Sequence, residues 1–203
     1  MRYAETHKSE TRRRLVRAAA GAVRARGPEG VSVAQIMAEL DLTHGGFYAH
    51  FPNKQALVVA AIAEAFDQGH RRFGRLTESM DRETALAAFI DAYVSTAHRD
   101  SPERGCPIAI LAGDLPRQGS AVRKAFDAGV AAMLARIAGW LPPGDDAARH
   151  SLANSLMAEM AGAVALSRAL SDTDVAARLL DDCRGRIKAR AGLSEGASSS
   201  ENG

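Results

Sequence analysis

Cysteine and long apolar runs are scarce in this sequence, and an apolar N-terminal segment is absent. The only cysteines, Cys106 and Cys183, form no CxxC or Cys/His cluster, so neither a disulfide framework nor a zinc module is expected. The apolar stretches Gln55–Ala63 and Gly105–Gly113 stop at nine residues each, well short of the ~18 that a membrane span needs. Because Met1–Glu10 carries charges instead of an apolar h-region, we expect a protein of the cytoplasm.

Signatures of catalysis are also missing. The sequence contains no GxSxG, P-loop, GxGxxG or HExxH motif. Its histidines show no spacing that is typical of metal ligands; they are His7, His44, His50, His70, His98 and His150. We therefore expect neither an enzyme nor a protein with a metal or other cofactor.

The composition, with 46% apolar and 25% charged residues, is that of a folded chain of one or two domains. Charge is distributed unevenly. Residues 1–60 hold nine Lys/Arg and five Asp/Glu, a net charge of +4, and the remainder carries −2. A basic N-terminal third favours contact with a polyanion, although a solvated basic helix face would give the same count.

Apolar residues recur at helical spacing along nearly the whole chain, as in Val33, Ile36, Met37 and Leu40. The same period continues through residues 86–94, 122–140 and 175–187, and no alternating apolar run predicts a strand. We predict an all-α protein. A helix-turn-helix domain of three helices at the N-terminus precedes an antiparallel helical bundle.

The N-terminal helices are short and closely spaced. The pattern predicts a helix over about residues 9–26 and a second one that Ser32 caps through Gln35. After the link 41–43, Phe47 and Phe51 share one face of a third helix that Pro52 ends, and Asn53 caps a long helix reaching about Leu76. Two short helices separated by a turn of three or four residues are typical of helix-turn-helix architecture.

The third of these helices contains Gly45 and Gly46, which each cost about 1 kcal/mol relative to alanine. Glycine suits a helix that another backbone must approach closely, as in the major groove of DNA. With Phe47 and Phe51 in the core, a polar and aromatic face remains for duplex DNA. We predict contacts to bases or phosphates from Thr43, His44, Gly45, Tyr48 and His50, and phosphate contacts from Ser32 and Lys54. The competing interpretation is the surface of an ordinary small bundle.

The segment Tyr48-Ala49-His50-Phe51-Pro52-Asn53-Lys54-Gln55-Ala56-Leu57 carries a family resemblance. It is similar to the signature of the tetracycline-repressor (TetR) family of bacterial transcriptional regulators, and the likeness extends over about residues 12–61. One departure is Asp41, where the family usually has glycine; aspartate tolerates the left-handed backbone better than most residues. The resemblance implies a dimer, a ligand cavity in the C-terminal part, and repression that a bound ligand relieves.

The domains predicted are a DNA-binding domain over 1–55, a ligand-binding and dimerisation domain over 56–190, and a disordered tail over 191–203. Disorder is also expected for Met1 to about Thr6. Residues 145–190 form two antiparallel helices about Ser171, the first rich in alanine and glycine. This pair is the candidate dimer interface of a homodimer on a palindromic operator, with recognition helices about 34 Å apart.

The effector is expected to be a small apolar or aromatic molecule, because the candidate cavity residues are nearly all uncharged and apolar. They are Phe66, Phe89, Tyr93, Cys106, Ile110, Phe126, Met133, Trp140, Met157 and Met160. An alternative is control through a protein partner or through the thiol of Cys106, which precedes Pro107 at a predicted helix start near Arg104. Cys183 lies in an apolar stripe and is expected in the core.

Overall fold

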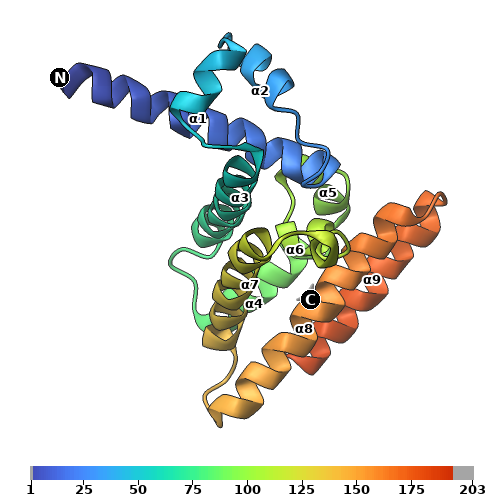
Figure 1. Ribbon diagram of the computed structural model, residues 1–203. Coiled ribbons are helices and arrows are strands. Elements are labelled where there is room, and N and C mark those ends of the chain that lie inside the picture. The colour runs from blue at the N-terminus through green and yellow to red at the C-terminus, as the bar shows by residue number, and fades with distance from the viewer. Residues whose placement is uncertain (1, 194–203) are drawn as a thin grey trace, which may run out of the picture. The chain divides into compact units, whose positions relative to one another are not determined.

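The computed structural model describes residues 2–193, and of residues 2–5 it describes the backbone alone (Figure 1). Helices occupy most of that range, and no strand occurs between residues 2 and 193, so the predicted all-α fold is confirmed. The α-helices and the 3₁₀ helices η1–η3 follow in this order: α1 Arg2–Arg26, α2 Val33–Glu39, η1 His44–Ala49, α3 Lys54–Leu76, α4 Arg82–Tyr93, α5 Thr96–Arg99, η2 Pro102–Arg104, α6 Pro107–Leu111, η3 Leu115–Arg117, α7 Ser120–Trp140, α8 Asp146–Ala169 and α9 Thr173–Arg190.

Contacts divide the chain into two compact units. Unit 1 consists of Met1–Gly74 and Ser101–Met133, and unit 2 consists of Arg75–Asp100 and Leu134–Gly203. The predicted DNA-binding domain therefore falls within unit 1, which also contains most of α3 and the segment from η2 into α7. Each unit is described on its own below.

Unit 1 is built on α1, which is longer than the sequence predicts. The helix begins at Arg2 rather than near Ser9, so the expectation of disorder before Thr6 is wrong for residues 2–6; Met1 lies outside the described residues. No glycine or proline interrupts residues 2–26 except Gly21, which explains the continuous helix. Its apolar face is buried in the core through Leu15, Ala19 and Val23.

Unit 2 contains the antiparallel pair α8 and α9, which lie side by side (Figure 1), with α4 against both. The pair turns where expected, because Asp172 caps α9 by accepting from the N–H groups of Asp174 and Val175 at 2.9 and 3.0 Å. Lys188 on α9 donates to the carboxylate of Asp91 on α4 at 2.6 Å. These contacts hold the three helices together.

The end of α9 is packed rather than frayed. Gly192 has φ of +76°, and the N–H of Leu193 donates to the Lys188 carbonyl at 3.0 Å. This left-handed glycine closes the helix and buries the side chain of Leu193. The predicted disorder is therefore wrong for residues 191–193, and residues 194–203 of the predicted tail lie outside the described residues.

Candidate DNA-binding surface

The predicted helix-turn-helix is present as α2, a turn over residues 40–43, and η1 (Figure 1). Ser32 caps α2 by accepting from the N–H of Gln35 at 3.3 Å. The side chain of Gln35 does not reach back to Ser32; it accepts from Arg26 at 3.0 Å, so only half of the capping box forms. Asp41 takes φ of +56°, which confirms the left-handed turn predicted at that position.

The predicted recognition helix is a 3₁₀ helix. The N–H of Gly46 donates to the Thr43 carbonyl, and the N–H of His50 donates to the Phe47 carbonyl, both at 2.9 Å. Phe47 and Phe51 are 1% and 2% exposed, and their rings stack with centroids 5.9 Å apart. Their predicted place in the core is confirmed, so the rest of η1 faces away from it.

That outward face contains four of the residues predicted to meet DNA. Thr43, His44 and Gly45 are exposed, and Tyr48 is 64% exposed. The His44 ring lies edge-on to the Tyr48 ring with centroids 6.4 Å apart. A large aromatic side chain held at the surface beside polar groups can stack on a base or donate to a phosphate.

His50 differs from the expectation that it points outward, because its side chain is half-buried. Within the described part of the chain, its Nδ1 is buried without a hydrogen-bond partner. Burial lowers the pKa of His50, and the positive charges of Lys8 and Arg12 lower it further. Arg12 lies close by, with its guanidinium carbon 4.6 Å from the centre of the Phe51 ring.

The two predicted phosphate anchors both have partners within unit 1. Ser32 is engaged as the cap of α2. The amine of Lys54 donates to the backbone carbonyl of Glu29 at 2.8 Å, a contact that the sequence does not reveal. Asn53 accepts from the N–H of Ala56 at 2.8 Å, which confirms it as the cap of α3. Lys54 therefore also holds the loop between α1 and α2.

Neither a close contact nor a backbone angle within the chain requires glycine at positions 45 and 46. A Cβ added to Gly45 would meet nothing within 4 Å, and one added to Gly46 would meet its nearest atom, Thr43 Oγ1, at an ordinary 3.4 Å. Neither residue takes a positive φ. The fold therefore gives no reason for glycine at position 45.

The predicted ligand-binding residues fall into two groups. Unit 1 holds Phe66, Cys106, Ile110, Phe126 and Met133, and unit 2 holds Phe89, Tyr93, Trp140, Met157 and Met160. Ring centroids are 5.6 Å apart for Phe66 and Phe126 and 5.3 Å apart for Phe89 and Trp140. Two pockets, of about 310 Å³ beside Lys54 and about 340 Å³ beside Leu141, are lined by other residues. A ligand site among the ten residues stays a prediction.

The cysteines differ in burial. Cys106 is 3% exposed and stands at the start of α6 before Pro107, as predicted. Cys183 is half-buried on α9, and burial, with Glu159 and Asp182, raises the pKa of its thiol. The expectation of a core position for Cys183 is therefore only partly met.

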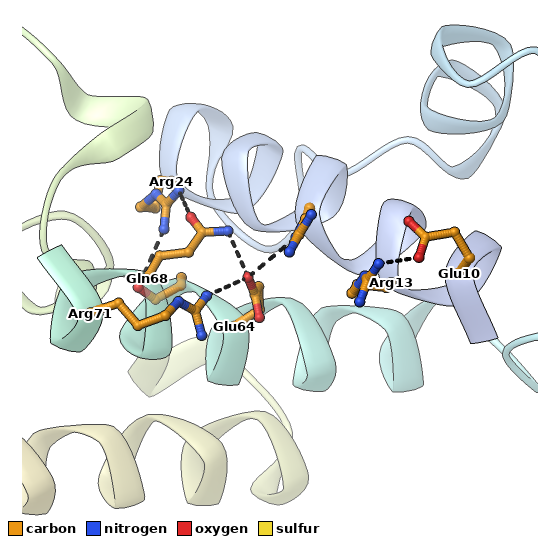
Figure 2. Close-up of polar contacts among 8 residues, drawn as sticks. Glu10, Arg13, Arg24, Glu64, Gln68 and Arg71 are labelled. Atoms are coloured by element: carbon orange, nitrogen blue, oxygen red, sulfur yellow. Dashed lines mark hydrogen bonds and ion pairs between the residues drawn. The ribbon is translucent and has the colours of Figure 1, made fainter. Parts of the chain in front are cut away.

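Sequence reasoning missed a polar network between α1 and α3 (Figure 2). Arg24, 5% exposed, donates to Gln68 Oε1 at 2.7 Å and to the carbonyl of Glu103 at 2.6 Å. Gln68 in turn donates to Glu64, which also accepts from Arg71 at 2.9 Å. One feature of the sequence could have predicted this network: Arg24 stands on the apolar face of its helix, one turn after Ala20 and next to Val23.

Two negative results hold for the described chain. Among residues 6–193, whose side chains are described, no three His, Cys, Asp or Glu are grouped so as to hold a metal ion. In the described part of the chain, residues 2–193, no helix is both long and apolar enough to span a bilayer.

Comparison with known proteins agrees with this geometry. Residues 15–61 match the bacterial regulatory proteins of the tetR family, and residues 83–182 match the tetracyclin repressor-like C-terminal domain. Over 77 residues the chain is 35% identical to the uncharacterized HTH-type transcriptional regulator YdgC of Bacillus subtilis. That alignment covers 38% of this chain and 37% of the relative.

Solved structures resemble the fold over most of its length. A TetR transcriptional regulator from Chloroflexus aurantiacus superposes with a TM-score of 0.75 at 26% identity, covering 91% of this chain and 95% of the other. A regulator of the TetR family from Cytophaga hutchinsonii gives 0.76 at 18% identity, with 93% and 97% covered. The reduced form of E. coli NemR gives 0.74 at 18% identity, with 89% and 96% covered. The chain belongs to the TetR family and is a helix-turn-helix transcriptional regulator rather than an enzyme.

Proposed function

We propose that this regulator binds a palindromic operator as a homodimer and represses transcription from the cytoplasm until a small molecule releases it. The exposed face of η1 carries the proposal. Thr43, His44 and Tyr48 stand outward on a helix whose opposite side is anchored by Phe47 and Phe51. In this proposal, residues 1–55 bind DNA and residues 56–190 bind the ligand and the second subunit.

Gly45 adds a second support for DNA as the partner. Its Cβ position is open within the chain, so the absence of a side chain benefits only something that approaches from outside. The backbone of a helix in the major groove comes close to base edges at such a position. The interpretation as a plain bundle surface offers no reason for the glycine.

Selection of binding sites from random duplex DNA tests the proposal. The full chain should enrich sites with two-fold symmetry whose half-sites lie about one helical turn, ~34 Å, apart. Tyr48→Ala should weaken binding to the selected site while thermal unfolding is unchanged. Sites without symmetry would overturn the dimeric arrangement, and no enrichment would overturn operator binding itself.

The proposed dimer surface is the outer face of α8 and α9. On α8, the small residues Ser155, Ala158 and Ala165 are exposed, and a Cβ on Gly162 would meet nothing within 4 Å. Leu166 is 59% exposed beside them. Their spacing puts these small residues along one stripe, which lets a second helix approach closely. Leu166→Glu should give a monomer in light scattering, and Glu83→Ala on exposed α4 surface should leave a dimer.

A ligand releases DNA only if it binds better to a conformation whose two recognition helices are misplaced for the half-sites. Such coupling is usually about 1–3 kcal/mol, or 5- to 150-fold in affinity. We propose an apolar or aromatic ligand for the ten candidate residues. Titration of Trp140 fluorescence with small molecules tests this, since a true inducer must change the fluorescence saturably and release DNA in the same concentration range.

The second candidate is control through Cys106 or through a protein partner. One observation favours the thiol route: a thiolate at Cys106 would be attracted to the guanidinium of Arg24 within unit 1. Its 3% exposure means that a reagent reaches it only when α6 opens locally.

A further inference from the structure

The N-terminal half of α1 carries two basic residues on the side of the recognition helix. Lys8 and Arg12 are four residues apart, so they lie on one face of the helix. Because α1 begins at Arg2, both stand within regular helix. Their positions relative to η1 are therefore fixed by the packing of α1 in unit 1.

Two independent observations place these charges beside η1. The Arg12 guanidinium carbon lies 4.6 Å from the centre of the Phe51 ring, directly after η1. Lys8 and Arg12 also both lower the pKa of His50, the residue that ends η1. The end of η1, at His50 and Phe51, and the two cations are thus neighbours in space, although more than 35 residues separate them in sequence.

The two cations are not neutralised by the described part of unit 1. Among residues 6–193, whose side chains are described, neither Lys8 nor Arg12 forms an ion pair, and both are exposed. Other arginines of the same helix are paired, Arg13 with Glu10 and Arg17 with Glu64. Like charges one turn apart repel each other, and burial together with these two charges lowers the pKa of His50 beside them. The repulsion between the two cations slightly destabilises the folded state, and an anion bound from outside would offset it.

We propose that Lys8 and Arg12 form a phosphate-binding edge that extends the contact of η1 along the backbone of duplex DNA. The inference rests on the proposed operator binding and adds residues outside the helix-turn-helix to it. Phosphate contacts of this kind set affinity and orientation but read no base. Lys8 and Arg12 should therefore contribute equally to the affinity for the operator and for unrelated duplex DNA.

The test measures affinity by fluorescence anisotropy between 50 and 300 mM KCl, with the full chain and two labelled duplexes. One duplex is a site selected from random DNA, and the other has the same length and a scrambled sequence. The variants are Lys8→Ala, Arg12→Ala and their combination. Arg123→Ala and Lys124→Ala on α7 are matched controls that remove exposed positive charges elsewhere in unit 1.

Each lost phosphate contact should reduce the slope of log affinity against log salt by about 0.9 and weaken binding about five-fold near 150 mM salt. The double variant should lose about twice the slope, on both duplexes alike. Arg12→Lys should restore the slope, because it keeps the charge. The controls should change neither quantity.

Any one of three outcomes would overturn the proposal that Lys8 and Arg12 bind DNA phosphates. The slope of the double variant equals that of the wild type; the variants weaken the selected site but not the scrambled duplex; or the controls lower the slope as much as the variants do. If the Arg12 variants unfold, Lys8→Ala alone still tests the proposal, since the Lys8 side chain is exposed. Failure of the edge is separate from failure of operator binding, because in the former case the wild type still binds and Tyr48→Ala still weakens it.

Discussion

The Nε of Arg24 donates a hydrogen bond of 2.6 Å to the backbone carbonyl of Glu103, 79 positions later in the chain. This contact fastens η2 to α1, and the same guanidinium reaches Gln68 on α3 (Figure 2). Burial lowers the pKa of Arg24, while the charges of Cys106, Glu103 and Glu64 raise it. The arginine thus joins the first helix of the DNA-binding part to the segment that leads into α6.

Arg24→Met should lower the free energy of unfolding by about 1.5–3 kcal/mol, because it leaves the Glu103 carbonyl and the Gln68 amide oxygen without a donor. Arg71→Met is the matched control in the same network. Arg71 is 52% exposed, so its loss should cost about 0–1 kcal/mol. Urea unfolding followed by circular dichroism measures both. Equal effects would mean that the buried contacts contribute no more than a surface ion pair.

Gly129→Ala should destabilise unit 1, because a Cβ at that position of α7 would overlap the buried ring of Phe66. Overpacking of this kind typically costs about 1–3 kcal/mol. Gly139→Ala in the same helix meets nothing within 4 Å and should instead stabilise by up to about 1 kcal/mol. Thermal melts of the two variants should shift in opposite directions. A shift in the same direction would contradict the close packing of Phe66 on α7.

Gly45→Ala should separate folding from DNA binding. The open space at Gly45 predicts unchanged or slightly increased stability, since alanine has the higher helix propensity. Binding to a selected operator should nevertheless weaken, because the added methyl group stands on the face proposed to approach the bases. Gly144→Ala, also in open space, is the control for both measurements. If Gly45→Ala binds the operator as tightly as the wild type, the open position of Gly45 no longer supports DNA as the partner.

His50 predicts two pH effects. In the free protein its pKa lies below the ordinary 6.5, so the unfolded state binds more protons as the pH falls through about 6.5. The contribution of His50 to stability should therefore decline with acidification, and His50→Gln should flatten this dependence. Urea unfolding between pH 5 and pH 8 measures it.

Operator binding should change with pH in the opposite sense. Phosphates beside Lys8 and Arg12 would offset the positive charges that lower the pKa of His50. Binding would then take up a proton, and affinity should rise as the pH falls from 8 to 6. If the affinity of His50→Gln for the operator rises equally between pH 8 and pH 6, groups other than His50 take up the proton.

Cys106→Ser tests the thiol alternative. Hydrogen peroxide oxidises a thiolate to a sulfenic acid and is itself reduced to water. If this reaction controls DNA binding, peroxide should release the wild type from its operator and leave Cys106→Ser bound. Cys183→Ser is the control, since burial and nearby acids raise the pKa of that thiol. Release of Cys106→Ser by peroxide would dismiss the sensor role of Cys106.

Local sequence determined the helices of the helix-turn-helix and most of their ends. Phe47 and Phe51 at helical spacing, Ser32 and Asn53 as caps, and Asp41 in the turn all act within a few residues of the chain, and the structure agrees with each. Such signals are readable because helix periodicity and capping depend on neighbours in sequence.

Only the tertiary structure decided what several polar residues do. Lys54 holds the Glu29 carbonyl, Arg24 holds that of Glu103, and His50 is half-buried beside Lys8 and Arg12. In sequence Lys54 and His50 look like any exposed base or histidine, and only the apolar neighbours of Arg24 distinguish it from other arginines. Their partners come from distant segments that meet only when the apolar faces of the helices are buried together, so no local pattern records them.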